Sequence, residues 1–185
     1  MIQHTLHGVT LEAVQGDIVQ QPDVDAIVNA ANAALRPGGG VAGAIHRAAG
    51  PGLAAECRPL ASIRPSEAVI TRAHDLPNHY VIHCLGPVYG VDERADRLLA
   101  AGYRRALRLA EEKEINSSAF PAISTGAFGY PLDPATEVTL ATVQAEPPAL
   151  SSVRHVRFVL WDDAAYQVYT RHLERLTQDS NPTDR

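Results

Sequence analysis

The residues best suited to chemistry lie in the first quarter of the chain. Two asparagines, Asn29 and Asn32, follow a short apolar run at residues 26–28, and three glycines at residues 38–40 precede a helix that we expect to begin at Val41. Asparagine amides bind hydroxyl and backbone groups without carrying charge. A glycine run lets backbone N–H groups approach an anion closely, and a helix N-terminus adds donors and a favourable dipole. The pattern indicates a site for a sugar joined to a phosphate. The alternative is that these residues form an ordinary surface loop.

A second small-residue loop follows a predicted strand at residues 118–123. Ser124 and Thr125 offer hydroxyl and N–H groups there, Gly126 allows close approach, and a helix is expected from Pro134. The loop is not a Walker loop, because no Gly-Lys-Ser/Thr sequence follows, and it lacks the GxGxxG spacing of a Rossmann fingerprint. Two such loops side by side could hold both phosphates of a diphosphate. The alternative is an ordinary turn between a strand and a helix.

Asp17 and Trp161 are further candidates for ligand binding. Asp17 follows a predicted strand at residues 9–14 and either caps a turn or accepts a hydrogen bond from an exocyclic amine such as that of adenine. Trp161, the only tryptophan, follows a predicted strand at residues 153–160 and either belongs to the core or stacks on a base. The residue types alone leave both alternatives open.

These candidates need elements that bring them to one place. Hydrophobic patterning predicts strands at residues 9–14, 26–29, 68–71, 80–85, 118–123 and 153–160. It predicts helices at residues 41–49, 53–60, 93–112, 134–146 and 163–176. Strands that alternate with helices predict an α/β fold whose sheet is covered by helices on both faces. Ligands in such folds bind beyond the carboxyl ends of the strands, where the candidate loops fall.

The composition is that of one soluble globular domain. The chain has 185 residues, 45% of them hydrophobic and 20% charged, with a net charge of −5. We expect one domain over residues 1–176 and a disordered polar tail at 177–185. The acidic balance argues against a nucleic-acid partner. Because no leader sequence and no membrane-spanning run is visible, we expect a cytoplasmic protein, and nothing demands more than a monomer.

Metal and redox chemistry are not expected from the sequence. Cys57 and Cys84 are not spaced as metal ligands and should be reduced, buried side chains. His4 and His7, near the N-terminus, are expected on the surface rather than as ligands. Since no His, Cys or Asp cluster has ligand spacing, neither a metal nor a cofactor is expected.

The chain resembles the macrodomain family of ADP-ribose-binding modules over about residues 9–176. The motifs that carry the resemblance keep their order and spacing: GDI at 16–18, NAAN at 29–32, GGGVAGAIHRAAGP at 38–51, AVIT at 68–71, YVIHCLGPVYG at 80–90 and AFPAISTGAFGYP at 119–131. Through GAIHRAAGP and LPNHYVIHCLGP it looks most like the MacroD-type hydrolases. The resemblance implies a three-layer α/β/α sandwich around a mixed, mainly parallel central sheet, with ADP-ribose as the ligand.

The resemblance also implies roles for the matching positions. Asp17 would bind the adenine amine with Ile18 nearby, and Trp161 would lie against the adenine. Asn32 would hold the distal ribose, and Asn29 would support that loop. The diphosphate would be lined on one side by Gly39, Gly40, Val41 and Ala42, and on the other by Ser124, Thr125, Gly126, Ala127 and Phe128.

One position departs from the MacroD-type pattern. Such sequences usually read GGGVDGAIH, with an aspartate that helps to position the attacking water, whereas this chain has Ala42. His46 lies four residues later on the same helical face, so the usual pair of aspartate and histidine is broken. His46 is then either the remaining acid–base group or a structural histidine inside the fold.

The leading hypothesis is hydrolysis at C1″ of the distal ribose, in mono-ADP-ribosyl esters on Glu or Asp or in O-acetyl-ADP-ribose. Asn32 would fix the ribose, His46 is the candidate acid–base group, and the substrate's own phosphate could orient or deprotonate water. Two alternatives remain: a non-catalytic reader of ADP-ribose, and a phosphatase that acts on ADP-ribose 1″-phosphate. The expected partners are ADP-ribose or ADP-ribosylated proteins.

Overall fold

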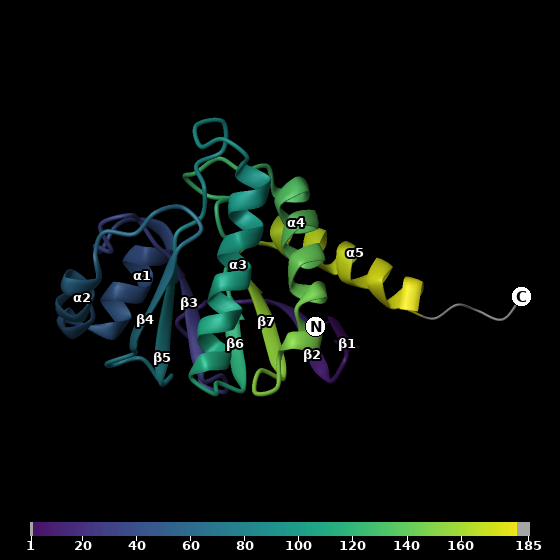
Figure 1. Ribbon diagram of the computed structural model, residues 1–185, viewed down its shortest axis with the longest axis horizontal. Helices are drawn as coiled ribbons and strands as arrows, with labels where there is room; N and C mark the ends of the chain where they lie inside the picture. The colour runs from purple at the N-terminus through teal and green to yellow at the C-terminus, as the bar shows by residue number, and fades with distance from the viewer. Residues whose placement is uncertain (1, 181–185) are drawn as a thin grey trace, which may run out of the picture.

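A seven-stranded sheet lies between two helical layers in the computed structural model, which describes residues 2–180 (Figure 1). The strands are β1 (Ile2–Leu6), β2 (Val9–Gln15), β3 (Ala26–Ala30), β4 (Ala68–Arg72), β5 (Tyr80–Cys84), β6 (Ser117–Phe120) and β7 (His155–Leu160). The helices are α1 (Gly40–Ala49), α2 (Pro51–Cys57), α3 (Ala95–Glu112), α4 (Leu132–Ala145) and α5 (Asp163–Ser180), with short 3-10 turns η1 (Arg58–Leu60) and η2 (Pro147–Ala149).

The order of the strands brings the candidate loops to one edge of the sheet. The order is β1-β2-β7-β6-β3-β5-β4, in which β2, β7, β6, β3 and β5 run parallel and the outer strands β1 and β4 run antiparallel to their neighbours. The prediction of a mixed, mainly parallel sheet is therefore confirmed. Because the carboxyl ends of parallel strands meet, the segments that follow these five strands lie along the same edge.

The two faces of the sheet are buried by different helices. In β3 and β6, Ile27 and Ala119 pack in a core with α1 and α2, whereas their neighbours Val28 and Phe120 pack in a second core with α3, α4 and α5. Figure 1 shows α3 and α4 together over this second face. Strands that are buried on both faces consist of nearly continuous apolar residues. Such runs are easily recognised in the sequence, so these strands were predicted.

A charge network lies on the same face as α1, toward the β1 edge of the sheet. Arg157 of β7 pairs with Glu12 of β2 and with Asp23, whose Oδ2 lies 2.6 Å from Nη2. Arg157 Nη1 also donates to Gln21 at 2.9 Å, and His155 lies 3.0 Å from the second oxygen of Glu12. The hydrogen bond from Arg157 holds the pKa of Asp23 down to about 2. The network fastens the loop between β2 and β3 to the sheet.

Strand β1 was not predicted, and the expected exposure of His4, which lies in this strand, is wrong. His4 was expected on the surface, but it is only 7% exposed and its Nδ1 lies 3.3 Å from Thr177 Oγ1 of α5. The residues of β1 carry little apolar alternation, so only their pairing with β2 reveals them as a strand. His7 is exposed in the turn between β1 and β2, as predicted.

Several element ends differ from the predicted ones for local reasons. Strand β6 ends at Phe120 rather than Ile123, because Pro121 has no N–H for the ladder. Helix α2 begins at Pro51, a residue suited to a first turn. Helix α5 continues to Ser180, so residues 177–180 of the expected disordered tail are helical, and the rest of that tail lies outside the described residues.

Two further findings concern the cysteines and the helices of the described part. Cys57 and Cys84 are both free and buried, as predicted. Within residues 2–180, no helix is both long and apolar enough to cross a membrane.

The substitution Asp23→Asn should flatten the acid dependence of stability. The folded-state pKa of Asp23 lies below its ordinary value of 3.8, so the charged carboxylate stabilises the fold above that value. This contribution is lost as the pH falls through about 2. We expect the free energy of unfolding, measured by urea titration, to fall less on acidification in the variant than in the wild type. Glu137→Gln, an exposed change on α4, is the control, and an equal fall in all three proteins would contradict the assignment.

Candidate functional site

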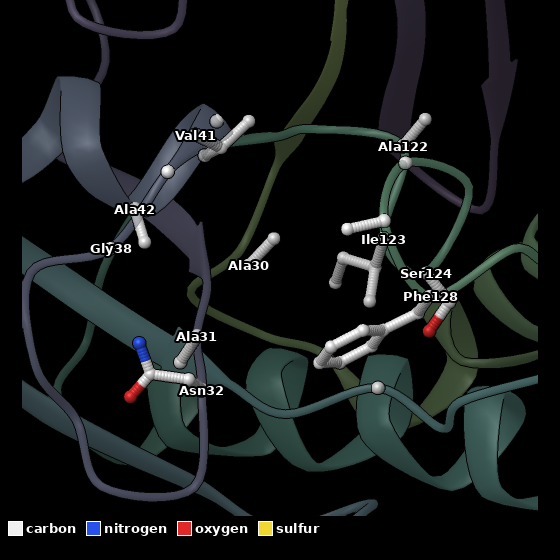
Figure 2. A pocket seen from close by; sticks show the side chains of 15 residues that line it. Ala30, Ala31, Asn32, Gly38, Val41, Ala42, Ala122, Ile123, Ser124 and Phe128 are labelled. Carbon is white, nitrogen blue, oxygen red and sulfur yellow. The ribbon is translucent and has the colours of Figure 1, made fainter.

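Two cavities meet at the carboxyl edge of the parallel strands. The first cavity, of about 410 Å³, lies among the segments that follow β3, β5 and β6 and the start of α1. The second cavity, of about 440 Å³, lies among the segments that follow β2, β6 and β7. Both are lined by Gly40, Val41, Ala122 and Gly126, so together they form one cleft. Figure 2 shows the first cavity with Asn32 and Val41 on one side and Ser124 and Phe128 on the other.

The start of α1 presents unpaired backbone donors to this cleft. Gly39 is the N-cap and offers no side-chain cap, and the first bond of the helix runs from Gly43 N to Gly39 O at 3.2 Å. The N–H groups that therefore lack an intrahelical acceptor are those of Gly40, Val41 and Ala42. Gly43 itself must be a glycine, because a Cβ there would overlap the carbonyl oxygen of Gly38. The glycine run is thus packed tightly on the helix that it opens.

The loop after β6 faces this helix start across the first cavity. Ser124 adopts a left-handed conformation with φ of 68°, and its carbonyl accepts the N–H of Tyr130 at 2.9 Å. Thr125 turns its hydroxyl back to the Ala122 carbonyl at 2.8 Å. The next three N–H groups, those of Gly126, Ala127 and Phe128, donate to no residue of the described part of the chain. Free N–H groups therefore line the cleft from two opposed loops.

Gly86, at the end of β5, also lines the first cavity, and the sequence analysis did not identify it. A Cβ at Gly86 would overlap Ser124 Oγ and would lie 2.6 Å from Ile123 Cγ2. The absence of a side chain therefore lets the Ser124 loop approach the end of β5. The sequence signal was only a glycine followed by a proline, which marks the end of a strand without showing what packs against it.

Asn32 lines the first cavity with an amide that is already oriented. Its Nδ2 donates to the Arg36 carbonyl at 2.8 Å, and its Oδ1 accepts the Arg36 N–H at 3.0 Å. The turn between them is closed by Leu35 N, which donates to Asn32 O at 3.1 Å. Both ends of the amide are thus fixed by main-chain partners, so the side chain is held at the wall of the cavity.

His46, which the sequence left as either an acid–base group or a structural histidine, lines neither cavity. It is buried on α1 one turn after Ala42, and neither ring nitrogen has a hydrogen-bond partner among the described residues. Burial lowers the pKa of His46, which disfavours its charged form. Ala44 and Arg47 on another side of α1 line the second cavity, whereas the His46 ring lies 6.4 Å from the ring of His83 on β5. Ala42 lines the first cavity and His46 does not.

Three buried side chains, on β3, β5 and β4, form a hydrogen-bonded network next to the first cavity. Asn29 Nδ2 donates to His83 Nδ1 at 3.1 Å, and His83 Nε2 lies 2.9 Å from Thr71 Oγ1. Thr71 Oγ1 also lies 3.0 Å from the Arg72 carbonyl, to which its hydroxyl can donate while it accepts from His83 Nε2. Burial lowers the pKa of His83 to about 3, which keeps the ring neutral. Asn29, directly before the cavity residue Ala30, is thereby fixed in one orientation.

The second cavity holds the remaining candidates. Trp161 is 77% exposed and lines this cavity together with Ile18, so it is not a core residue. Asp17 accepts the Val19 N–H at 3.1 Å through Oδ1, which is the turn-capping role considered above. Its neighbours Gly16 and Ile18 both line the cavity, whereas Asp17 is not itself a lining residue.

The side chains that line the first cavity are suited to binding a ligand. Among the described residues that line it, no side chain titrates; the lining consists of glycine, alanine and other apolar residues with Asn32 and Ser124. Within residues 2–180, no group of three or more His, Cys, Asp or Glu side chains is placed to hold a metal ion. The arrangement can bind an anion through N–H groups and orient hydroxyls through an amide.

Comparison with known proteins gives consistent matches over most of the chain. Residues 28–139 match the family model described as Macro domain. A Macro domain-containing protein of Streptomyces coelicolor is 46% identical over 90% of this chain and 98% of its own length. The solved Oceanobacillus iheyensis macrodomain with ADP has a TM-score of 0.91 and 36% identity, covering 96% of this chain and 97% of that one. The Trypanosoma brucei macrodomain in complex with ADP-ribose has a TM-score of 0.82 and 35% identity, covering 88% and 68%.

Replacing Thr71 by Val should destabilise the fold. The change removes the hydroxyl that is hydrogen-bonded to the buried His83 ring, and we expect a loss of about 1–3 kcal/mol in the free energy of unfolding measured with urea. Thr71→Ser keeps the hydroxyl and should lose much less. If the two variants lose the same amount, the hydroxyl does not contribute and the hydrogen bond to His83 is contradicted.

Proposed function

Because the chain belongs to the Macro domain family, we propose that its cleft binds ADP-ribose. The observation that carries the proposal is the pair of facing loops in the first cavity. The free N–H groups at residues 40–42 and 126–128 would hold the two phosphates between them without a charged side chain. Solved relatives that share the fold contain ADP or ADP-ribose, which supports the same ligand class here.

We place the other parts of the ligand by the residues that line the two cavities. The adenine would lie in the second cavity between Ile18 and Trp161, with its amine donating to the free carboxylate oxygen of Asp17. The distal ribose would lie at the far end of the first cavity beside Asn32. This orientation uses the exposed indole as a stacking surface, and it leaves C1″ of the ribose at the end of the cleft.

We further propose that the chain hydrolyses derivatives linked at C1″, such as mono-ADP-ribosyl esters on Glu or Asp and O-acetyl-ADP-ribose. Water would replace the carboxylate at C1″, and the products would be ADP-ribose and the free acid. Since no side chain of the first cavity titrates, the substrate's own phosphate would orient or deprotonate the water. The facing N–H groups would fix that phosphate, and Asn32 would fix the ribose. His46 has no direct part in this proposal because it does not reach the cleft.

A reader that binds ADP-ribose without cleaving it is the second candidate. The same uncharged lining favours it, because Ala42 lies where the MacroD-type pattern has an aspartate. Release of ADP-ribose from a protein modified on Glu or Asp separates the two functions. Release of inorganic phosphate from ADP-ribose 1″-phosphate would instead indicate a phosphatase.

Asn32→Ala should reduce turnover far more than binding. The amide contributes orientation at the reacting ribose, whereas the N–H groups that would bind the phosphates remain. We expect the rate of ADP-ribose release to fall by at least about tenfold, with the dissociation constant for ADP-ribose changed by less than about threefold. Equal losses in rate and in affinity would show that Asn32 only binds, and the wild type is the control for both assays.

Asp17→Ala should weaken the binding of ADP-ribose by about 1–3 kcal/mol, the scale of a lost hydrogen bond to a charged group. Isothermal titration calorimetry measures the change directly. The loss should be much smaller for ribose 5-phosphate, which has no adenine amine. An unchanged dissociation constant for ADP-ribose would contradict the placement of adenine in the second cavity.

A further inference from the structure

A third cavity lies directly beside the distal end of the cleft. Its volume is about 560 Å³, and we call it the arginine pocket. The residues that line it are Ala34, Leu35, Arg36, Pro37, Ala54, Arg58, Ala61 and Ser62. Arg36 and Arg58 are both exposed, and neither forms an ion pair with a residue of the described part of the chain. Two arginines without an ion pair therefore line the pocket, and no acidic residue does.

The walls of the arginine pocket are fixed to each other and to the core. Ile63 N donates to the Ala33 carbonyl at 3.0 Å, which joins the loop before α1 to the segment after η1. Leu35 is 3% exposed and Ile63 is 6% exposed, and both pack in the core under α1 and α2. The two arginines thus extend from backbone segments whose relative position is set by buried contacts.

The arginine pocket and the first cavity share one turn of chain. Asn32 lines the first cavity, and the main chain of Arg36, which lines the arginine pocket, holds both ends of the Asn32 amide. If ADP-ribose lies as proposed above, a group attached to C1″ leaves the cleft beside this turn. The inference that follows rests on that proposed function.

We propose that the arginine pocket binds acidic side chains of a protein substrate next to its ADP-ribosylated residue. Guanidinium groups pair with carboxylates in a planar geometry, and free arginines attract acidic groups even on a chain of net charge −5. The lining is aliphatic apart from the two arginines and Ser62, and it contains no aromatic ring on which a nucleic-acid base could stack. An acidic peptide segment fits this chemistry better than an oligonucleotide.

The test compares two peptides that carry ADP-ribose through the same hydrolysis-resistant linkage. One has Asp and Glu on both sides of the modified residue, and the other has Asn and Gln at those positions. The wild type should bind the acidic peptide about five- to tenfold more tightly in fluorescence anisotropy. Arg58→Gln and Arg36→Gln should each lose most of this preference, while the affinity for the neutral peptide stays the same. Arg97→Gln removes an exposed arginine from α3 and should keep the full preference.

The possible outcomes separate this inference from the proposed function. Equal affinities for the two peptides, with free ADP-ribose still bound, would overturn the peptide site alone. Failure to bind free ADP-ribose would overturn the proposed function and this inference with it. Tighter binding of an ADP-ribosylated oligonucleotide than of the acidic peptide, lost in the same two variants, would assign the pocket to nucleic acid and also overturn it.

Discussion

Unpaired backbone N–H groups at the carboxyl edge of the sheet are the feature on which the site depends. A buried N–H without a partner is unfavourable, so facing rows of such donors are stable only where water or a ligand can reach them. Here the start of α1 and the loop after β6 present these donors to one cleft. Small residues permit the arrangement, because a side chain at Gly43 or Gly86 would collide with the loops that carry it.

The cleft is positioned by polar groups that lie outside it. The hydrogen bonds that join Asn29, His83 and Thr71 fix the end of β3. The Arg157 network fixes the loop that carries Asp17. The charged and titratable groups thus act as supports, while the lining of the first cavity stays neutral. This division suits a ligand that brings its own negative charge, because no carboxylate repels it there.

The sequence predicts the local parts of this structure well and the tertiary parts poorly. Buried strands, glycine loops and the edge where they meet follow from short-range patterns, so the loops at Asn32 and Ser124 were placed correctly at one cavity. His46 misses the cleft because its side of α1 packs toward His83 on the sheet, and residue spacing alone does not show how a helix packs. Strand β1 has little apolar alternation and is defined by its pairing with β2. The close approach of Gly86 to Ser124 joins segments far apart in the chain, so no local signal reveals it.

Titration calorimetry with ADP-ribose and with AMP tests the central claim most directly. AMP keeps the adenine and one phosphate but lacks the second phosphate and the distal ribose. If the facing N–H groups bind a diphosphate, ADP-ribose will bind at one site with an affinity at least about tenfold higher than that of AMP, a difference of about 1.4 kcal/mol. Equal affinities for the two ligands, or no heat of binding for ADP-ribose, would contradict the account.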